Sequence, residues 1–139
     1  MRTILLILVG LSSMLSAEFT RDANGIVTDS STGLVWQDDA IGSTTTWENA
    51  IDRCEALSLG GHDDWRLPNL RELTSLIDNT KYDPSINMIF QNTASSYYWS
   101  STSYASSSNY AWVVYFYSGG QYYGYKARSY YVRCVVAGQ

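Results

Sequence analysis

Residues 95–125 read SSYYWSSTSYASSSNYAWVVYFYSGGQYYGY, and this stretch decides the architecture of the C-terminal third. Along residues 111–117 the positions of Trp112, Val114 and Phe116 alternate with those of Ala111, Val113, Tyr115 and Tyr117, which is typical of a strand with two different faces. The turn residues Ser118-Gly119-Gly120 follow, and residues 121–126 return as the partner strand of a hairpin. With a further strand at residues 97–102, the pattern predicts an antiparallel sheet.

The same region carries almost no charge. Residues 84–125, a run of 42, contain no Asp, Glu, Lys or Arg, yet they hold nine of the twelve tyrosines. Ser, Gly, Ala and Asn fill most of the rest of residues 95–125. Antibody paratopes have this composition because Tyr supplies rigid contact area and Ser, Gly and Asn supply adaptable hydrogen bonds. The composition therefore predicts a binding surface rather than a catalytic pocket.

Alternation along residues 111–117 assigns the two strand faces. Trp112, Val114 and Phe116 are predicted to face the core, and Val113, Tyr115 and Tyr117 to face outward. We place Tyr123 and Tyr125 of the partner strand on the same outer face as a hypothesis, since the hairpin register does not follow from the pattern. A row of phenol rings would then cover one side of the sheet, and clustered exposed aromatics indicate an interaction site.

Tyr also has a high strand propensity, so about half of the tyrosines are expected to be ordinary packing residues. Those best suited to packing are Tyr97, Tyr98, Tyr130 and Tyr131. The candidate ligand-binding residues are Tyr104, Ser106, Ser107, Ser108, Asn109, Tyr110, Tyr115, Tyr117, Gln121, Tyr122, Tyr123 and Tyr125.

The N-terminal half predicts strands and a first helix. Residues 19–37 form a short β-meander, because turn dipeptides separate brief apolar runs. Thr45 and Glu48 match a capping box, with Thr45 as the N-cap, and the helix they begin is expected to run to about Leu59.

A second helix is predicted after Pro68. Asn69 is the expected N-cap and Glu72 the expected N3 residue, with an end near Asp78-Asn79. Residues 130–136 are predicted to be the strand that ends the sheet. The order of strands and helices gives an α+β fold class.

The first 17 residues predict a signal peptide, with Arg2 before an apolar run at residues 4–11 and a cleavage site at Leu15-Ser16-Ala17. An uncleaved anchor is the alternative. Residues 18–139 then form a single domain that is secreted, periplasmic or on the cell surface. This part carries 13 acidic and 8 basic residues, because Arg2 accounts for one of the 9 in the chain. An acidic balance disfavours nucleic acid and membrane insertion of the mature chain.

Only two cysteines occur, Cys54 and Cys134. An even count in an exported protein favours a disulfide, and two buried free thiols are the alternative. Two Cys and the single histidine, His62, do not supply a four-ligand metal site, and no cofactor is predicted. The acidic residues that would have to hold calcium are better explained as solvated loops: Asp29, Asp38, Asp39, Asp63 and Asp64.

The remaining polar candidates favour structure over catalysis. His62 stands beside glycine and aspartates, as a loop residue does, and no nucleophile stands at motif spacing from it. Arg66 precedes a capped helix and is expected to pair with a local carboxylate or carbonyl. Arg133 is expected to be a fold residue of the last strand. We therefore predict that the chain is not an enzyme.

An ordered set of motifs resembles a known bacterial family, named for the C-terminal domain of the Legionella collagen-like adhesin. The motifs span most of residues 19–136, and they are TGLVWQD at 32–38, DWRLP at 64–68, YWSST at 98–102, AW at 111–112 and YVRCV at 131–135. The family is similar to C-type-lectin-like folds. The resemblance implies two helices beside a twisted, mainly antiparallel sheet with a long irregular insert, and a Cys54–Cys134 disulfide.

The resemblance also implies an exported adhesion module for a carbohydrate or another cell-surface ligand. Two departures narrow this expectation. The predicted face has no Lys or Arg cluster for polyanionic glycans, and the chain lacks the Glu-Pro-Asn or Gln-Pro-Asp triplet of calcium-dependent lectins. The expected partner is a glycan or a cell-surface protein bound through the Tyr- and Ser-rich face.

A second resemblance leaves other functions open. The Tyr, Ser, Asn and Gly content of residues 95–125 looks like that of variable proteins diversified by retroelements, which also use C-type-lectin-like folds. The alternatives are therefore a protein-binding variable domain, or a structural subunit of a homo-oligomer whose aromatic face is buried.

Overall fold

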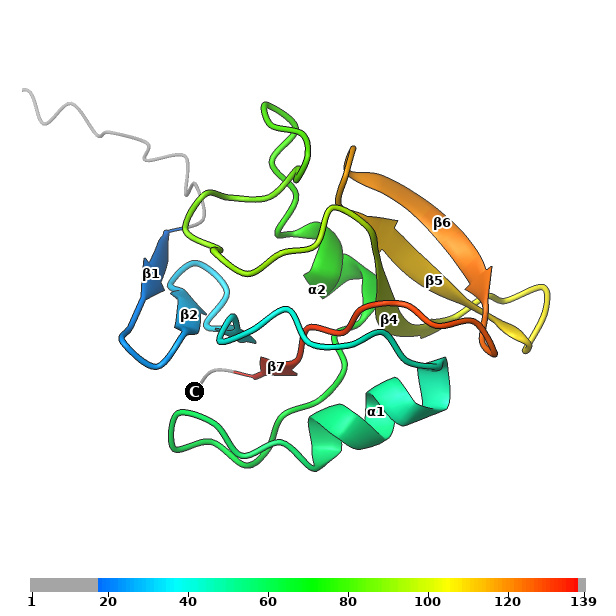
Figure 1. The fold of residues 1–139 in the computed structure, drawn as a ribbon, viewed down its shortest axis with the longest axis horizontal. Helices are drawn as coiled ribbons and strands as arrows, with labels where there is room; N and C mark the ends of the chain where they lie inside the picture. The colour runs from blue at the N-terminus through cyan, green and yellow to red at the C-terminus, as the bar shows by residue number, and fades with distance from the viewer. Residues whose placement is uncertain (1–17, 138–139) are drawn as a thin grey trace, which may run out of the picture.

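A computed structural model describes residues 18–137, so the signal peptide predicted at residues 1–17 lies outside the described residues. The described chain has two helices and two antiparallel sheets (Figure 1), which confirms the α+β class. Within residues 18–137 no helix is both long enough and apolar enough to cross a membrane.

The first sheet contains both ends of the described chain. Its strands are β1 (Phe19–Arg21), β2 (Ile26–Asp29), β3 (Val35–Gln37) and β7 (Val135–Val136), in that order across the sheet. The predicted meander is confirmed. Gly25 and Gly33 turn the chain with φ angles of 78° and 74°, which favour glycine.

The last strand is much shorter than the predicted residues 130–136, and it joins the first sheet rather than the Tyr-rich one. Only β7 pairs in a ladder, with β3. Tyr130 and Tyr131 make isolated bridges to Thr45 and Tyr98 instead. The prediction is wrong because this segment passes between the two sheets and bonds to partners in both.

The second sheet is the predicted antiparallel one, with β4 (Tyr97–Ser103), β5 (Tyr110–Tyr115) and β6 (Gly120–Tyr125) in chain order. β5 ends two residues before the predicted Tyr117. The N–H groups of Ser118 and Gly119 bond to the Tyr115 carbonyl at 3.3 and 2.8 Å, which closes the turn.

The first helix, α1 (Trp47–Glu55), is shorter than predicted and lacks the predicted capping box. Its N-cap is Thr46, whose side chain makes no capping hydrogen bond. Thr45 cannot be the cap because its backbone exchanges two 2.9 Å hydrogen bonds with Tyr130.

The second helix, α2 (Leu70–Thr74), also ends earlier than expected, but its capping box is confirmed. The Glu72 N–H donates to Asn69 Oδ1 at 2.8 Å, and the Asn69 N–H donates to Glu72 Oε1 at 2.9 Å. Arg66 pairs with the same glutamate through two 2.7 Å bonds, as expected for an arginine beside a local carboxylate.

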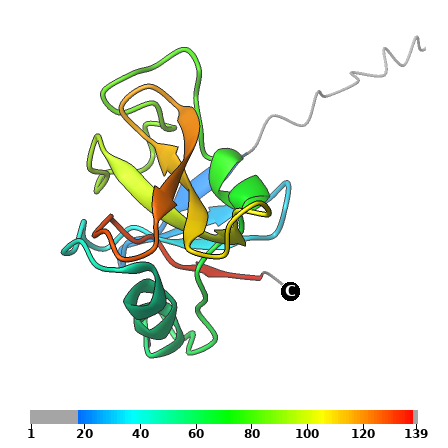
Figure 2. The same ribbon diagram turned by 90° about the vertical axis from the view of Figure 1, so that its right-hand side faces the viewer.

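Apolar clusters cover both faces of the second sheet. Val113 lies in the cluster on the α1 side with Trp99, and Val114 and Phe116 lie in the other cluster with Leu73 of α2. Figures 1 and 2 show the two helices at separate places beside this sheet. The prediction of one core face on β5 is wrong, because Val113 is only 1% exposed.

A disulfide and a buried ion pair fix the last part of the chain in place. Cys54 of α1 and Cys134, just before β7, form the expected disulfide across 80 residues of sequence. Arg133, which is buried, pairs with the buried Asp38 at the end of β3, so it is a fold residue as predicted.

Candidate functional site

Strand register divides the tyrosines between two faces of the second sheet. β5 and β6 pair so that Tyr110 lies opposite Tyr125 and Trp112 opposite Tyr123. Residues that lie directly opposite share a face, and neighbours along a strand alternate. We call the group Tyr104, Tyr110, Trp112, Tyr123 and Tyr125 the Trp112 face.

The predicted single row of phenols is therefore wrong. Tyr115 lies opposite Gly120 and next along from the Val113–Tyr122 pair, so Tyr115 and Tyr122 are on the face away from Tyr123. Tyr117 follows β5 in the turn and contacts Tyr115, with ring centroids 5.8 Å apart. The hypothesis failed because the hairpin register, which the pattern did not reveal, sets the sharing of faces.

The rings of the Trp112 face support one another. Tyr104 and Tyr123 stack with centroids 4.3 Å apart and planes 15° apart. Trp112 meets Tyr104 edge-on at 5.5 Å, and Tyr110 meets Tyr123 and Tyr125 edge-on at 5.7 and 5.6 Å. Tyr123 is nevertheless 52% exposed and Tyr125 45% exposed. The face therefore offers aromatic surface whose orientation is already fixed before a ligand arrives.

Trp112 is a member of this face that the sequence did not predict. Alternation assigned it to the core with Val114, and the structure does place both on one face of β5. The core ends at Val114, however, and Trp112 is half-buried under Tyr104 and Tyr123. An alternating pattern gives the side of a strand but not where along it the core stops.

The opposite face carries a more deeply packed aromatic cluster. Tyr97 meets Tyr115 at 4.3 Å and Tyr130 at 5.2 Å, and Tyr130 meets Trp99 at 4.7 Å. Burial raises the pKa of the Tyr97 phenol, and the neighbouring phenols add to the shift. The packing role predicted for Tyr97, Tyr98, Tyr130 and Tyr131 is confirmed, because all four lie within or against the two core clusters.

The loop of residues 104–109 is held by its backbone. Tyr104 donates to the Tyr110 carbonyl at 2.9 Å, and Ser107 donates to the Tyr104 carbonyl at 3.2 Å. Ser106, Ser108 and Asn109 are exposed, as is Gln121. Within residues 18–137 the side chains of these residues and of Ser107 bond to no other protein group, which leaves their donors and acceptors for a ligand.

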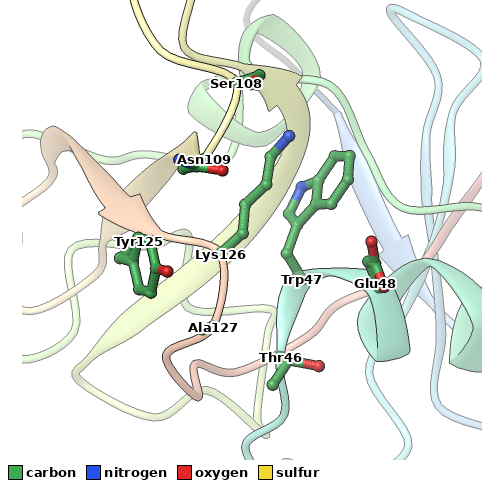
Figure 3. A pocket seen from close by; sticks show the side chains of 8 residues that line it. All are labelled: Thr46, Trp47, Glu48, Ser108, Asn109, Tyr125, Lys126 and Ala127. Carbon is green, nitrogen blue, oxygen red and sulfur yellow. The ribbon is translucent and has the colours of Figure 1, made fainter.

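A hollow of about 430 Å³ lies between this loop and α1 (Figure 3). We call it the Trp47 hollow, and its lining residues are Thr46, Trp47, Glu48, Ser108, Asn109, Tyr125, Lys126 and Ala127. Figure 3 shows Lys126 reaching across it between Asn109 and the indole. The Lys126 Nζ lies 3.9 Å from the Trp47 ring centroid and donates to Ser103 Oγ at 3.0 Å.

A second hollow of about 510 Å³ lies beside β6, and we call it the Arg128 hollow. Its lining residues are Tyr110, Tyr123, Gly124, Tyr125, Arg128 and Tyr130. Tyr125 borders both hollows. Three predicted residues reach the Trp47 hollow and three reach the Arg128 hollow, with Tyr125 counted in each.

Lys126 and Arg128 correct the expectation of a face without Lys or Arg. Both follow the uncharged stretch directly, and the chain turns after Tyr125 through a 2.9 Å bond from the Arg128 N–H to the Tyr125 carbonyl. Trp47 was also missed, because helical spacing assigned it to the inner side of α1. Its indole N–H donates to the Ser100 carbonyl at 2.9 Å while one ring face meets Lys126.

The residues weighed for catalysis or metal binding make structural contacts. His62 packs edge-on against Trp65 at 5.9 Å, and both cysteines are in the disulfide. Asp38 binds arginines, and Asp29 accepts hydrogen bonds from Ser31 and Thr32 in its own turn, so these two are buried rather than in solvated loops as expected. Among residues 18–137 no three His, Cys, Asp or Glu side chains gather as metal ligands would.

A family model described as the Lcl C-terminal domain matches residues 25–136, which include every strand except β1, both helices and the two hollows. A comparison with curated proteins finds no match.

Proposed function

We propose a function from one premise: the chain belongs to the Lcl C-terminal domain family. The family points to an adhesion-like domain. The proposal is an exported, non-enzymatic domain with a C-type-lectin-like fold that binds carbohydrate through the Trp112 face. Export to the periplasm, the surface or the medium is part of the proposal.

The observation that carries the proposal is the stacked pair of Tyr104 and Tyr123 within a set of mutually braced, exposed rings. A pyranose ring presents an apolar face of C–H groups, which packs against an aromatic ring, and hydroxyl groups around its edge. Rings that are already held in place lose little side-chain entropy when a ligand binds. Such a surface suits a flat, weakly charged ligand.

Hydrogen-bonding groups surround these rings on two sides. Ser108 and Asn109 line the Trp47 hollow next to Tyr125, and Arg128 lines the other hollow. Few polar groups beside a larger aromatic area are the usual arrangement of small-molecule sites, where the polar groups fix orientation. Sugar hydroxyls would be held here, while the rings would supply most of the contact area.

Protein recognition is the second candidate function, and one observation favours it. Ser106, Ser108, Asn109 and Gln121 are exposed and have no side-chain bonds within residues 18–137, so replacing them would leave the fold intact. A surface diversified by a retroelement needs such positions. The coding DNA tests this idea, because a nearby template repeat that differs only at adenines would support it and the lack of one would refute it.

Adjacent tyrosines allow a matched test of carbohydrate binding. Tyr123 and Tyr122 are 52% and 50% exposed and lie on opposite faces of β6. On a glycan array, Tyr123→Ser is expected to lose the signal of the wild-type protein, and Tyr122→Ser to keep it. Near-UV circular dichroism would establish that both variants fold.

The outcomes of this test are distinct. Equal binding by both variants would refute the Trp112 face as the site. A wild-type protein that binds no glycan would refute carbohydrate recognition and leave the protein partner as the candidate.

A further inference from the structure

β6 is an edge strand with hydrogen-bonding groups that face away from the sheet. The strand order is β4-β5-β6, and Figure 1 shows β6 as the outermost strand. The Lys126 N–H donates to the Asn109 carbonyl at 2.8 Å, so alternation turns the backbone groups of Tyr122 and Gly124 toward β5. The backbone groups of Gln121, Tyr123 and Tyr125 therefore point outward.

These outward groups have few partners within residues 18–137. The Tyr125 carbonyl accepts the Arg128 N–H at 2.9 Å. The N–H and carbonyl groups of Gln121 and Tyr123, and the N–H of Tyr125, bond to no other part of the described chain. Such a row of open donors and acceptors is a template for another strand.

β6 contains no charge, proline or bulge that would oppose that pairing. Proteins commonly protect an edge strand with Lys, Pro, a bulge or a covering loop. β6 reads GQYYGY, without charge or proline, and its register with β5 is continuous from Gly120 to Tyr125. Tyr122 and Tyr123 are each about half exposed, so the strand presents aromatic surface on both of its faces.

We propose that two copies of this chain pair antiparallel through their β6 edges, about a two-fold axis at Tyr123. In that register Tyr123 lies opposite its equivalent, and Gln121 lies opposite Tyr125 of the second copy. The Tyr123 N–H and carbonyl groups bond reciprocally, and the Tyr125 N–H donates to the Gln121 carbonyl of the other copy. The two sheets become one.

The side chains of β6 fit this register. Tyr122 falls opposite Gly124 of the second copy, so its ring would meet the Tyr130 ring that covers this glycine. In each copy the Tyr130 ring packs on Gly124, and its Cε2 atom lies 2.5 Å from the place that a Cβ on Gly124 would take. Contact between these two aromatic rings adds packing across the strand pair.

Lack of charge favours a second copy over an unrelated partner. A two-fold contact places a strand against itself, so a charge near the axis would meet its own equivalent. Residues 84–125 contain no charge at all. An unlike partner would instead be selected by complementary charges, which β6 does not offer.

Pairing would also join the two Trp112 faces, since Tyr123 belongs to both the edge and that face. Two ligand sites on one rigid sheet bind a repeated ligand with greater avidity than either alone.

The test uses the protein purified from the exported fraction, without glycan. In sedimentation velocity over a concentration series, the apparent mass of the protein is expected to rise to that of a dimer. Tyr123→Lys places like charges opposite each other at the axis and is expected to raise the dissociation constant at least about tenfold. Tyr117→Lys makes the same charge change off the edge, at a residue that is 43% exposed, and is expected to dimerise like the wild type.

Hydrogen exchange gives a second readout that does not depend on a variant. The Tyr123 amide points outward, and its protection is expected to rise with protein concentration. The Tyr122 amide already bonds within the sheet, and its protection is expected to stay constant. A wild-type protein that stays monomeric, an assembly larger than a dimer, or equal association of Tyr123→Lys and the wild type would each overturn the proposal.

Discussion

The Asp38 Oδ1 atom lies 2.9 Å from the Arg133 Nη1 atom, and neither side chain is more than 2% exposed. Asp38 also pairs with Arg21 and accepts the backbone N–H groups of Gln91 and Asn92 at 2.8 and 3.1 Å. One carboxylate therefore ties β1, the end of β3 and the segment before β4 to the last part of the chain. The segment at Gln91 and Asn92 leads into β4 of the second sheet, which carries the Trp112 face.

Asp38→Asn should be strongly destabilising, because it leaves the Arg133 guanidinium buried without its counter-charge. Removing one partner of a buried ion pair costs about 3–5 kcal/mol. Urea denaturation measures the loss in the free energy of unfolding. Asp39→Asn is the matched control, since Asp39 is exposed, and it should change that free energy by less than about 0.5 kcal/mol. Similar losses in the two variants would contradict the structural role of Asp38.

The two helix caps should respond differently to alanine. Asn69→Ala removes a side-chain bond to the Glu72 N–H and should cost about 1 kcal/mol of unfolding free energy. Thr46→Ala should cost close to nothing through capping, because the Thr46 side chain makes no capping bond. Thermal or urea denaturation of both variants compares them directly. A larger loss for Thr46→Ala would show that the caps are misassigned.

These caps illustrate which parts of the fold local sequence predicts. The box at Asn69 and Glu72 forms because the side-chain partners of Glu72, Asn69 and Arg66, are both near it in sequence. The similar motif at Thr45 and Glu48 does not form, because Thr45 is held by Tyr130, which is distant in sequence. Local patterns gave the order of elements and the capping of α2, whereas partners far along the chain decided the ends of helices and the place of the last strand.

In the candidate site, too, local sequence predicted some features and partners distant in sequence decided others. Composition alone identified Tyr104, Tyr110, Tyr123 and Tyr125, but the pairing of β5 with β6 decided which rings share a face. Lys126 and Arg128 were missed because they lie just outside the uncharged stretch, where the chain folds back over Tyr125. Sequence reasoning can propose a set of residues, and register divides that set into surfaces.

Gly25 and Gly61 both have a left-handed backbone, but they differ in the space around them. Alanine variants at the two positions therefore distinguish the conformational cost of a Cβ from its steric cost. Gly25 has a φ of 78°, and a Cβ there would lie 2.7 Å from the Asp39 Cα. Gly61 has a φ of 82°, and a Cβ there would meet nothing within 4 Å. Gly61→Ala should cost about 1–2 kcal/mol of unfolding free energy, from the left-handed conformation alone.

Gly25→Ala should cost clearly more than Gly61→Ala, because backbone atoms at Asp39 must also move. That movement would disturb the 2.8 Å bond from the Asp38 N–H to the Gly25 carbonyl. Urea denaturation of the two variants side by side tests the difference. Equal losses would mean that the Asp39 backbone yields without cost.

The Arg66–Glu72 pair should make part of the stability depend on pH. Hydrogen bonds from the Arg66 side chain hold the pKa of the Glu72 carboxyl below its ordinary value of 4.5. A carboxyl whose pKa is lower in the folded state contributes stability above the unfolded value and loses it as pH falls through the folded value. The contribution is expected to be about 1 kcal/mol or less, because both side chains are partly exposed to solvent.

Glu72→Gln isolates this contribution, since Gln keeps an oxygen for the Asn69 N–H but cannot ionise. The variant should be less stable than the wild type near neutral pH, and the gap in unfolding free energy should close as pH falls below 4.5. Asp78, whose pKa is also lowered by hydrogen bonds from Thr80, is present in both proteins and cancels in the comparison. Urea denaturation across this pH range measures the gap, and a gap that stays constant would show that the Glu72 charge contributes nothing to the fold.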